Sequence, residues 1–295
     1  MNTDSANGNE SGAGSRDPAR NGLVDYGRLI SALGIVWFHT QAPGMRLAYA
    51  ALPFFLVLLA MPSRARPAMR ARRLLIPFLQ WSAIYAGIHL IFALRRAEPP
   101  LGWWEWNMLL AGTAIHLWFL PFVFLVSLSA PLLRLPFMAP TAALATALML
   151  GAFGTPQAIP WAQWSFGLIP VLIGFSRFTA GGRIAWATLA LCWLILSAFR
   201  PSPDNSAILL GTGIALLTLS LKLAPTGISH RCASLSMWIY LAHPLAIIAG
   251  QTAGLAGTGL ALFALPGAVL IAVGIAAGRK LSFGIRMPGA PGGGR

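Results

Sequence analysis

Residues 25–40 read DYGRLISALGIVWFHT, an apolar run in which Arg28 and His39 are separated by no other charged residue. At about 100° per residue, an offset of eleven residues places both side chains on one face of a helix. At about 1.5 Å per residue, His39 lies roughly 16 Å along the axis from Arg28, near mid-bilayer if Arg28 marks the entrance. Ionisable groups at such a depth usually face a cavity or a partner. The stretch therefore predicts a membrane-spanning helix with one functional face.

A purely structural interpretation of the same two residues stays open. The guanidinium of Arg28 could extend to the lipid headgroups, and His39 could form a hydrogen bond with a neighbouring helix.

The composition excludes a soluble domain. Of the 295 residues, 57% are hydrophobic and only 9% are charged, and the mean hydropathy is +0.70. These values are typical of a polytopic membrane protein. The net charge of +14 does not indicate nucleic-acid binding, because the arginines fall in short loops between apolar runs. Two cysteines, Cys192 and Cys232, form neither a disulfide framework nor a zinc ligand set, and we expect no metal.

Three regions follow from the hydropathy pattern. Residues 1–22 are polar and rich in Gly, Ser and Asn, which predicts a disordered cytoplasmic leader. Residues 23–280 form the transmembrane domain, and residues 281–295 form a cytoplasmic tail. The domain contains ten apolar segments, at about 23–42, 46–61, 74–94, 109–133, 138–153, 161–176, 184–199, 206–221, 234–250 and 259–277.

The basic residues set the orientation. With the N-terminus inside, most of them fall in inner loops, which is the positive-inside pattern. We therefore predict an all-α transmembrane bundle of about ten spans, with both termini cytoplasmic. The inner group is Arg64, Arg66, Arg70, Arg72, Arg73, Arg134, Arg177, Arg183, Lys222, Arg231, Arg279, Lys280 and Arg286, and the outer group is Arg46, Arg95, Arg96 and Arg200.

Several short motifs, taken in order, resemble one family. The first-helix pattern comprises Asp25, Tyr26, Arg28, Ile35, Val36 and His39. It is followed by LPFF at 52–55, RRLLIP at 72–77, HLWFL at 116–120 and SMWIYLAHP at 236–244. Together they resemble the acyltransferase 3 family of integral membrane proteins, whose first helix carries an Arg and a His separated by ten residues.

The resemblance implies transfer of an acyl group, most often acetyl from acetyl-CoA, to a hydroxyl of an extra-cytoplasmic or lipid-linked glycan. We expect acetyl-CoA or another acyl-CoA as donor, membrane lipid and polysaccharide-synthesis proteins as partners, and the bacterial inner membrane as location. A sugar hydroxyl needs a general base to attack a thioester, and neutral imidazole is suited to that role. His39 is the predicted catalytic base, or alternatively it carries the acyl group itself.

Arginines are the predicted donor-binding groups, because a guanidinium binds phosphate oxygens through paired hydrogen bonds. Arg28 could bind CoA phosphate or orient the thioester, and we count it with His39 as catalytic. Among the inner cluster, Arg72 and Arg73 are preferred over Arg70. The positive-inside pattern alone also explains this cluster.

Acceptor binding is assigned to three residues, His116, Trp118 and Glu105. We expect His116 near the outer membrane surface, because the HLWFL run leads back inward from an outer loop. Trp103, Trp104, Trp106 and Trp118 could stack on sugar faces, although an interfacial aromatic belt is the preferred explanation.

Two further functions remain open from the sequence. Arg28 and His39 could serve as an anion contact and proton relay in a transporter or flippase for a lipid-linked saccharide. The chain could also be a non-catalytic partner in polysaccharide export. No Gly-x-Ser-x-Gly elbow or phosphate-cradling glycine loop favours a hydrolase or P-loop protein.

Overall fold

The computed structural model describes residues 20–61 and 67–284, and every regular element in these ranges is a helix. Most of the predicted leader, most of the predicted tail, and Arg64, Arg66 and Arg286 lie outside the described residues. The elements are α1 (Gly22–His39), α2 (Met45–Ala48), α3 (Ala51–Leu58), α4 (Pro67–Arg95), α5 (Met108–Ala111), the 3-10 helix η1 (Ile115–Trp118), α6 (Phe119–Leu133), α7 (Met138–Phe153), α8 (Trp161–Thr179), α9 (Gly182–Phe199), α10 (Pro203–Ser220), α11 (Gly227–Thr252) and α12 (Gly257–Gly284).

Polar side chains define where three of the helices begin. Asn21 caps α1 by accepting a hydrogen bond from the backbone N–H of Leu23. Ser202 caps α10 in the same way, with Pro203 at the first helical position. Thr226 and Ser229 form a reciprocal capping box at the start of α11.

The helices α1 and α11 run parallel and in register. The Tyr26 hydroxyl lies 3.1 Å from that of Thr226, and the Ser229 hydroxyl donates to Asp25 at 3.4 Å. The end of α10 joins the same face, because the Asn21 amide donates to the carbonyl of Leu221 at 2.6 Å. The starts of α1 and α11 and the end of α10 therefore share one face of the bundle, as the charge pattern predicts.

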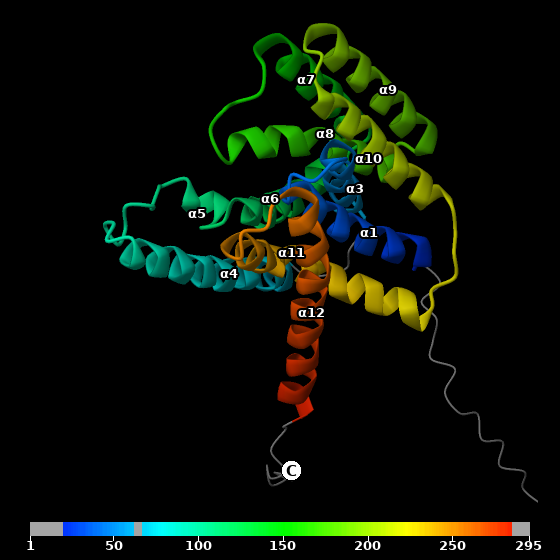
Figure 1. Cartoon of the computed structure of the whole chain (residues 1–295). Helices are drawn as coiled ribbons and strands as arrows, with labels where there is room; N and C mark the ends of the chain where they lie inside the picture. Colours follow the sequence, from blue (N-terminus) through cyan, green and yellow to red (C-terminus); the bar gives the residue numbers. More distant parts are fainter. Residues whose placement is uncertain (1–19, 62–66, 285–295) are drawn as a thin grey trace, which may run out of the picture.

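The short helix α3 lies between two groups of helices (Figure 1). It packs against α1 on one side and against α8 and α10 on the other. The group formed by α7 to α10 lies above α3 in Figure 1, and α1, α4 and α11 lie below it. Helix α12 packs on α11 and α1 and then extends beyond the rest of the bundle.

In the part of the chain that the structure describes, five helical segments are long and apolar enough to cross a membrane. Each of the ten predicted apolar segments coincides with one helix or with two or three consecutive ones, but α2–α3 and α7 are short. The fold is therefore an all-α, multi-pass membrane architecture, while the count of about ten spans and the location of the termini stay predictions. The five segments are Ala68–Arg95, Ile115–Leu133, Gly182–Phe199, Gly227–Thr252 and Gly257–Gly278.

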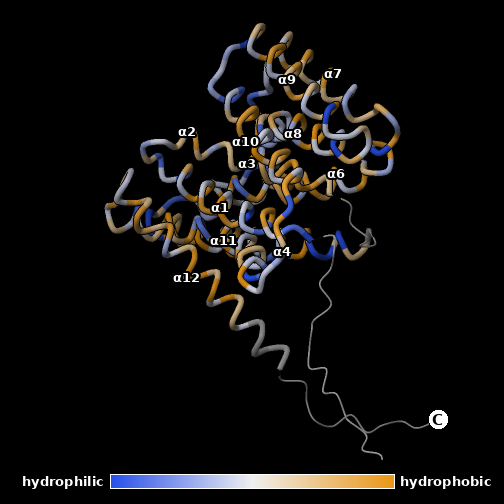
Figure 2. Tube along the Cα trace, turned by 90° about the vertical axis from the view of Figure 1, so that its right-hand side faces the viewer, coloured by the Kyte–Doolittle hydropathy of each residue, from blue (hydrophilic) through white to orange (hydrophobic). Residues whose placement is uncertain are grey.

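The surface of the bundle is suited to lipid. Leu262 and Leu270 on α12 are 65% and 70% exposed, and this helix is hydrophobic along most of its length (Figure 2). Large apolar side chains exposed over whole helices are explained by contact with hydrocarbon, because water would disfavour them.

A glycine contact between α10 and the start of α3 gives a test of this packing. A Cβ atom on Gly211 would lie 2.0 Å from the carbonyl oxygen of Ala50, whereas one on Gly213 would meet only ordinary contacts at 3.5 Å. We expect Gly211→Ala to lower the thermal unfolding midpoint in lipid nanodiscs, because the two backbones must separate. Gly213→Ala is the matched control and should leave the midpoint unchanged or raise it slightly. Equal midpoints for the two variants would contradict this helix contact.

Candidate active site

Three histidines from distant parts of the chain converge inside the bundle. The ring centroids of His39 on α1 and His243 on α11 lie 5.1 Å apart, with 29° between the ring planes. His116 of η1 packs edge-on against His243, also at 5.1 Å. His116 and His243 are 4% and 1% exposed. The predicted catalytic histidine therefore lies in a cluster of imidazoles.

The register of α1 against α11 brings the first pair together. Asp25 contacts Ser229 and His39 stacks on His243, so the sequence offset is 204 residues at both places. Helix α11 continues for nine residues beyond His243, whereas α1 ends at His39. At about 1.5 Å per residue, the histidine pair thus lies roughly 14 Å inside the end of α11.

Two tyrosines hold the third histidine in place. The Tyr240 hydroxyl donates to the carbonyl oxygen of His116, and the Tyr85 hydroxyl donates to that of Leu241 at 2.8 Å. The rings of both tyrosines also contact the His116 imidazole edge-on. The η1 backbone is thus bonded to α11 through Tyr240, and the Tyr85 ring of α4 packs against the His116 imidazole, so η1 forms a wall of the cluster.

The ring of His39 borders a cavity of about 260 Å³, here called the histidine cavity. His39 makes no hydrogen bond to any of the residues that the structure describes, so its ring nitrogens are available to a molecule in this cavity. The wall includes His116, Trp118 and Tyr240, together with Tyr49 from the turn between α2 and α3 and Gln163 from α8.

His243 differs from His39 in its hydrogen bonding. Its Nδ1 donates to the carbonyl of Tyr240 at 2.7 Å, which orients the ring. Its Nε2 is buried and makes no hydrogen bond within the described part of the chain. Since His243 does not line the histidine cavity, its contribution is to position the His39 ring by stacking.

Arg28 borders a second cavity of about 230 Å³, here called the Arg28 cavity. Ile35 and Tyr240 line both this cavity and the histidine cavity, so the two are neighbours along the same face of α1. This arrangement agrees with the shared face predicted for Arg28 and His39. Asp25 is engaged in an ion pair with Arg20 at 2.8 Å and does not neutralise Arg28 by direct pairing.

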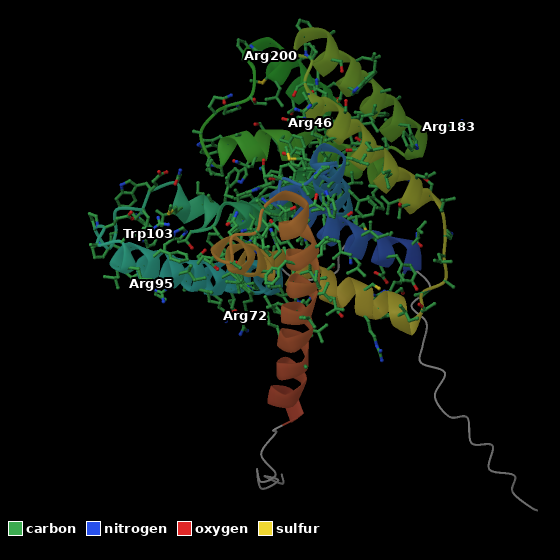
Figure 3. The ribbon with its side chains drawn as sticks, viewed as in Figure 1. Arg46, Arg72, Arg95, Trp103, Arg183 and Arg200 are labelled. Atoms are coloured by element: carbon green, nitrogen blue, oxygen red, sulfur yellow. The ribbon has the colours of Figure 1, made fainter. Side chains whose placement is uncertain are left out.

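A third cavity of about 200 Å³ is lined by Arg70, Arg73 and Arg134, and we call it the arginine cavity. Leu59 lines it as well as the Arg28 cavity. Arg72, which is labelled in Figure 3, does not border it, although it is exposed in the same way as Arg73 and Arg134. The geometry therefore favours Arg70 and Arg73 over Arg72, and the preference for Arg72 drawn from the sequence has no support in this cavity.

The three predicted acceptor residues are separated in the fold. His116 and Trp118 line the histidine cavity, and both side chains are buried inside the bundle. The position of His116 near the outer membrane surface stays a prediction. Glu105 is exposed, accepts a hydrogen bond from the Asn107 side chain at 2.9 Å and lines none of these three cavities. Its loop follows the far end of α4, where Trp103 is labelled in Figure 3.

Four residues of the site received no site role from the sequence. Tyr240 and His243 both belong to the SMWIYLAHP motif, where His243 was interpreted as a helix-packing residue and the role of Tyr240 depends on the position of His116. Arg134 was interpreted only as a topology signal. Gln163 was visible as a lone amide in an apolar run.

Among the described residues, no group of three or more His, Cys, Asp or Glu side chains has a geometry that could hold a metal ion. The imidazoles of the cluster can act as base or nucleophile, and the Arg28 cavity lies beside them.

Comparison with known proteins gives one match. A family model described as an acyltransferase domain, that of acyltransferase family 3, matches residues 21–277. No curated protein and no solved structure matches significantly.

The buried hydroxyl of Tyr240 provides a test of the site architecture. We expect Tyr240→Phe to destabilise the fold by about 1–3 kcal/mol, because the buried His116 carbonyl loses its donor. Tyr26→Phe is the control, since its hydroxyl pairs with Thr226 at an exposed position. Thermal unfolding in nanodiscs, followed by tryptophan fluorescence, would compare the two. A larger loss for Tyr26→Phe would show that the Tyr240 contact does not hold the wall of the cluster.

Proposed function

The chain belongs to the acyltransferase 3 family, and from this premise we propose that it is a membrane O-acyltransferase that moves an acetyl group from cytoplasmic acetyl-CoA to a hydroxyl of an extra-cytoplasmic or lipid-linked glycan. The observation that carries the proposal is the series of neighbouring cavities that passes from arginines to the unpaired imidazole of His39. We place the protein in the bacterial cytoplasmic membrane.

The arginine cavity suits the nucleotide end of the donor. Arg70, Arg73 and Arg134 border one space, and CoA carries a pyrophosphate and a 3′-phosphate that their guanidinium groups could bind. These residues come from α4 and from the end of α6, so the site does not depend on a single charged loop. The positive-inside pattern alone would place arginines on this face of the membrane, but it does not require them to border the same cavity.

Arg28 stands between the arginines and the histidines. Its cavity is otherwise walled mostly by apolar side chains such as Phe55, Leu58 and Met237. An uncharged pantetheine arm fits such a lining, and the guanidinium can donate a hydrogen bond to an amide or thioester carbonyl. Donation to the thioester oxygen would stabilise the negative charge that develops there during attack.

The transfer step then follows from the position of His39. The neutral imidazole accepts the proton of the acceptor hydroxyl as the oxygen attacks the thioester carbonyl carbon. An ester bond forms, the carbon–sulfur bond breaks, and the imidazolium returns the proton to the departing CoA thiolate. The stacked His243 keeps the His39 ring oriented toward the cavity during both proton transfers. The acyl-histidine route remains the alternative within the same site.

Removal of the His39 imidazole should strongly reduce acyl transfer and leave the protein folded. We expect His39→Ala to lower the turnover number by about 10²-fold to 10⁴-fold. The measurement is thiol release from acetyl-CoA together with acetate ester formation on a glycolipid extract of the native host. His230→Ala is the control, because His230 is exposed at the start of α11. Near-normal transfer by folded His39→Ala would reject His39 as base and as acyl carrier.

The same assay separates the enzyme from a transporter. Glycolipid movement across a vesicle membrane without thiol release would support the flippase, whereas thiol release coupled to ester formation supports the acyltransferase.

The converging arginines predict a donor-specific defect. We expect Arg73→Gln combined with Arg134→Gln to raise the KM for acetyl-CoA by about tenfold or more, because two phosphate contacts are lost. The turnover number at saturating donor should change little. Arg183→Gln is the control, since this exposed arginine at the start of α9 lines none of the three cavities. An unchanged KM in the double variant would remove the arginine cavity from the donor path.

A further inference from the structure

A fourth cavity lies beyond the histidines, on the side away from the arginine cavity. Its volume is about 530 Å³, within the range of small-molecule sites, and we call it the Arg200 cavity. Tyr49 and Gln163 line both this cavity and the histidine cavity. The Arg200 cavity is therefore the next space after His39 along the series.

The connections between helices place this cavity on the face opposite Asn21. It is lined by the loop from α7 to α8, the loop from α9 to α10 and the first turns of α8 and α10. The end of α10 contacts Asn21, so the start of α10 lies at the far end of the bundle. A ligand could thus approach His39 from the face opposite to that of the donor.

The lining is rich in groups that recognise hydroxyls. Arg200, Asp204 and Asn205 contribute a cation, a carboxylate and an amide, and Thr155 and Gln157 add further polar side chains. The Asp204 carboxylate makes no ion pair or side-chain hydrogen bond with any described residue. A mixed set of donors and acceptors with both charges fits a polyhydroxylated ligand better than a strongly anionic one.

Arg200 borders the cavity and is held beside the end of α7 and the loop that follows it. Its Nε donates to the carbonyl of Gly151 at 3.3 Å. If Gly154, whose φ is +84°, carried a Cβ atom, that atom would lie 3.1 Å from the Arg200 guanidinium carbon. A side chain at Gly154 would therefore crowd the guanidinium. Asn205 donates to the Arg200 carbonyl at 2.8 Å and fixes the same loop.

The boundary between the two cavities offers both an aromatic surface and an amide. The Tyr49 ring is stacked between Phe38 and Phe166, at centroid distances of 4.5 and 4.9 Å. The Oε1 atom of Gln163 is buried and has no hydrogen-bond partner in the described residues. A buried amide oxygen without a hydrogen bond destabilises the fold, and a ligand hydroxyl that donates to it would remove this penalty.

We propose that the Arg200 cavity is the acceptor subsite, in which a neutral saccharide is held by Arg200 and Asp204 while Gln163 directs one hydroxyl toward His39. This assignment rests on the proposed function and places the acceptor away from the tryptophan-rich loop that contains Glu105. Figure 3 shows Arg200 and Trp103 in different parts of the molecule.

Three substitutions test the subsite in nanodiscs, with graded amounts of the native glycolipid extract as acceptor. Asp204→Asn, Arg200→Gln and Gln163→Leu should each raise the half-saturating amount of extract by about tenfold, because ligand hydrogen bonds are lost. The KM for acetyl-CoA should stay within about twofold of wild type. Glu98→Gln, which removes an exposed acid near the end of α4, is the control and should change neither value.

The outcomes distinguish a failure of the acceptor subsite from a failure of the proposed acyltransferase activity. Wild-type transfer with unchanged half-saturation in all three variants would overturn the subsite and leave the acyltransferase intact. A parallel loss of acetyl-CoA affinity would also count against it, because that result indicates a general distortion. Absence of any wild-type transfer to the extract would overturn the proposed function itself.

Thiol labelling gives a second test that does not require loss of a binding group. In a background with Cys232→Ser, the exposed Thr155 is replaced by Cys and treated in native cells with a bulky, membrane-impermeant maleimide. Labelling should block ester formation on the glycan while acetyl-CoA binding persists. Leu101→Cys, at a position that is 70% exposed in the other loop, is the matched control and should tolerate the label. Full transfer by labelled Thr155→Cys protein would overturn the subsite.

Discussion

The parallel packing of α1 against α11 is the constraint on which the site depends. Asp25 with Ser229 and His39 with His243 share the same offset, so the register is fixed at both ends of the contact. A shift of one residue would rotate α1 by about 100° and move Arg28 and His39 off their common cavity face together. The catalytic geometry and the helix packing are therefore one property of this interface.

The same interface explains why His39 differs from the other two histidines. His116 lies on η1, whose backbone is held by the Tyr240 hydroxyl, and His243 donates to a carbonyl within its own helix. His39 is the last residue of α1, where the chain turns toward α2 and leaves space beside the ring. A polar ring in apolar surroundings without a fixed partner is unfavourable, and such positions are retained where a substrate supplies the partner.

Sequence alone predicted the features that depend on local pattern. Hydropathy predicted the helical segments, and the eleven-residue offset predicted that Arg28 and His39 face the same side. It did not show that His116 is buried, because an HLWFL run is compatible with a surface or a buried wall, and the Tyr240 bond and the Tyr85 ring contact are tertiary features. It ranked Arg72 above Arg70, whereas the position of each residue on α4 decides which of them borders the cavity with Arg134. The number of membrane spans depends on short helices that neither hydropathy nor length resolves.

The boundary between the neighbouring cavities bears on which acyl donor the proposed enzyme would accept. Ile35 and Tyr240 line the boundary between the Arg28 cavity and the histidine cavity, and Tyr240 is held by its bond to His116. Phosphate groups that stay with the arginines need not cross this apolar boundary, where their desolvation would be costly. In the proposed reaction only an uncharged thioester arm has to pass, and the roughly 16 Å between Arg28 and His39 along α1 sets how far it must reach. Under that proposal, the boundary favours a donor with a charged head and a long neutral arm over small acyl phosphates, whose charge lies at the reacting end.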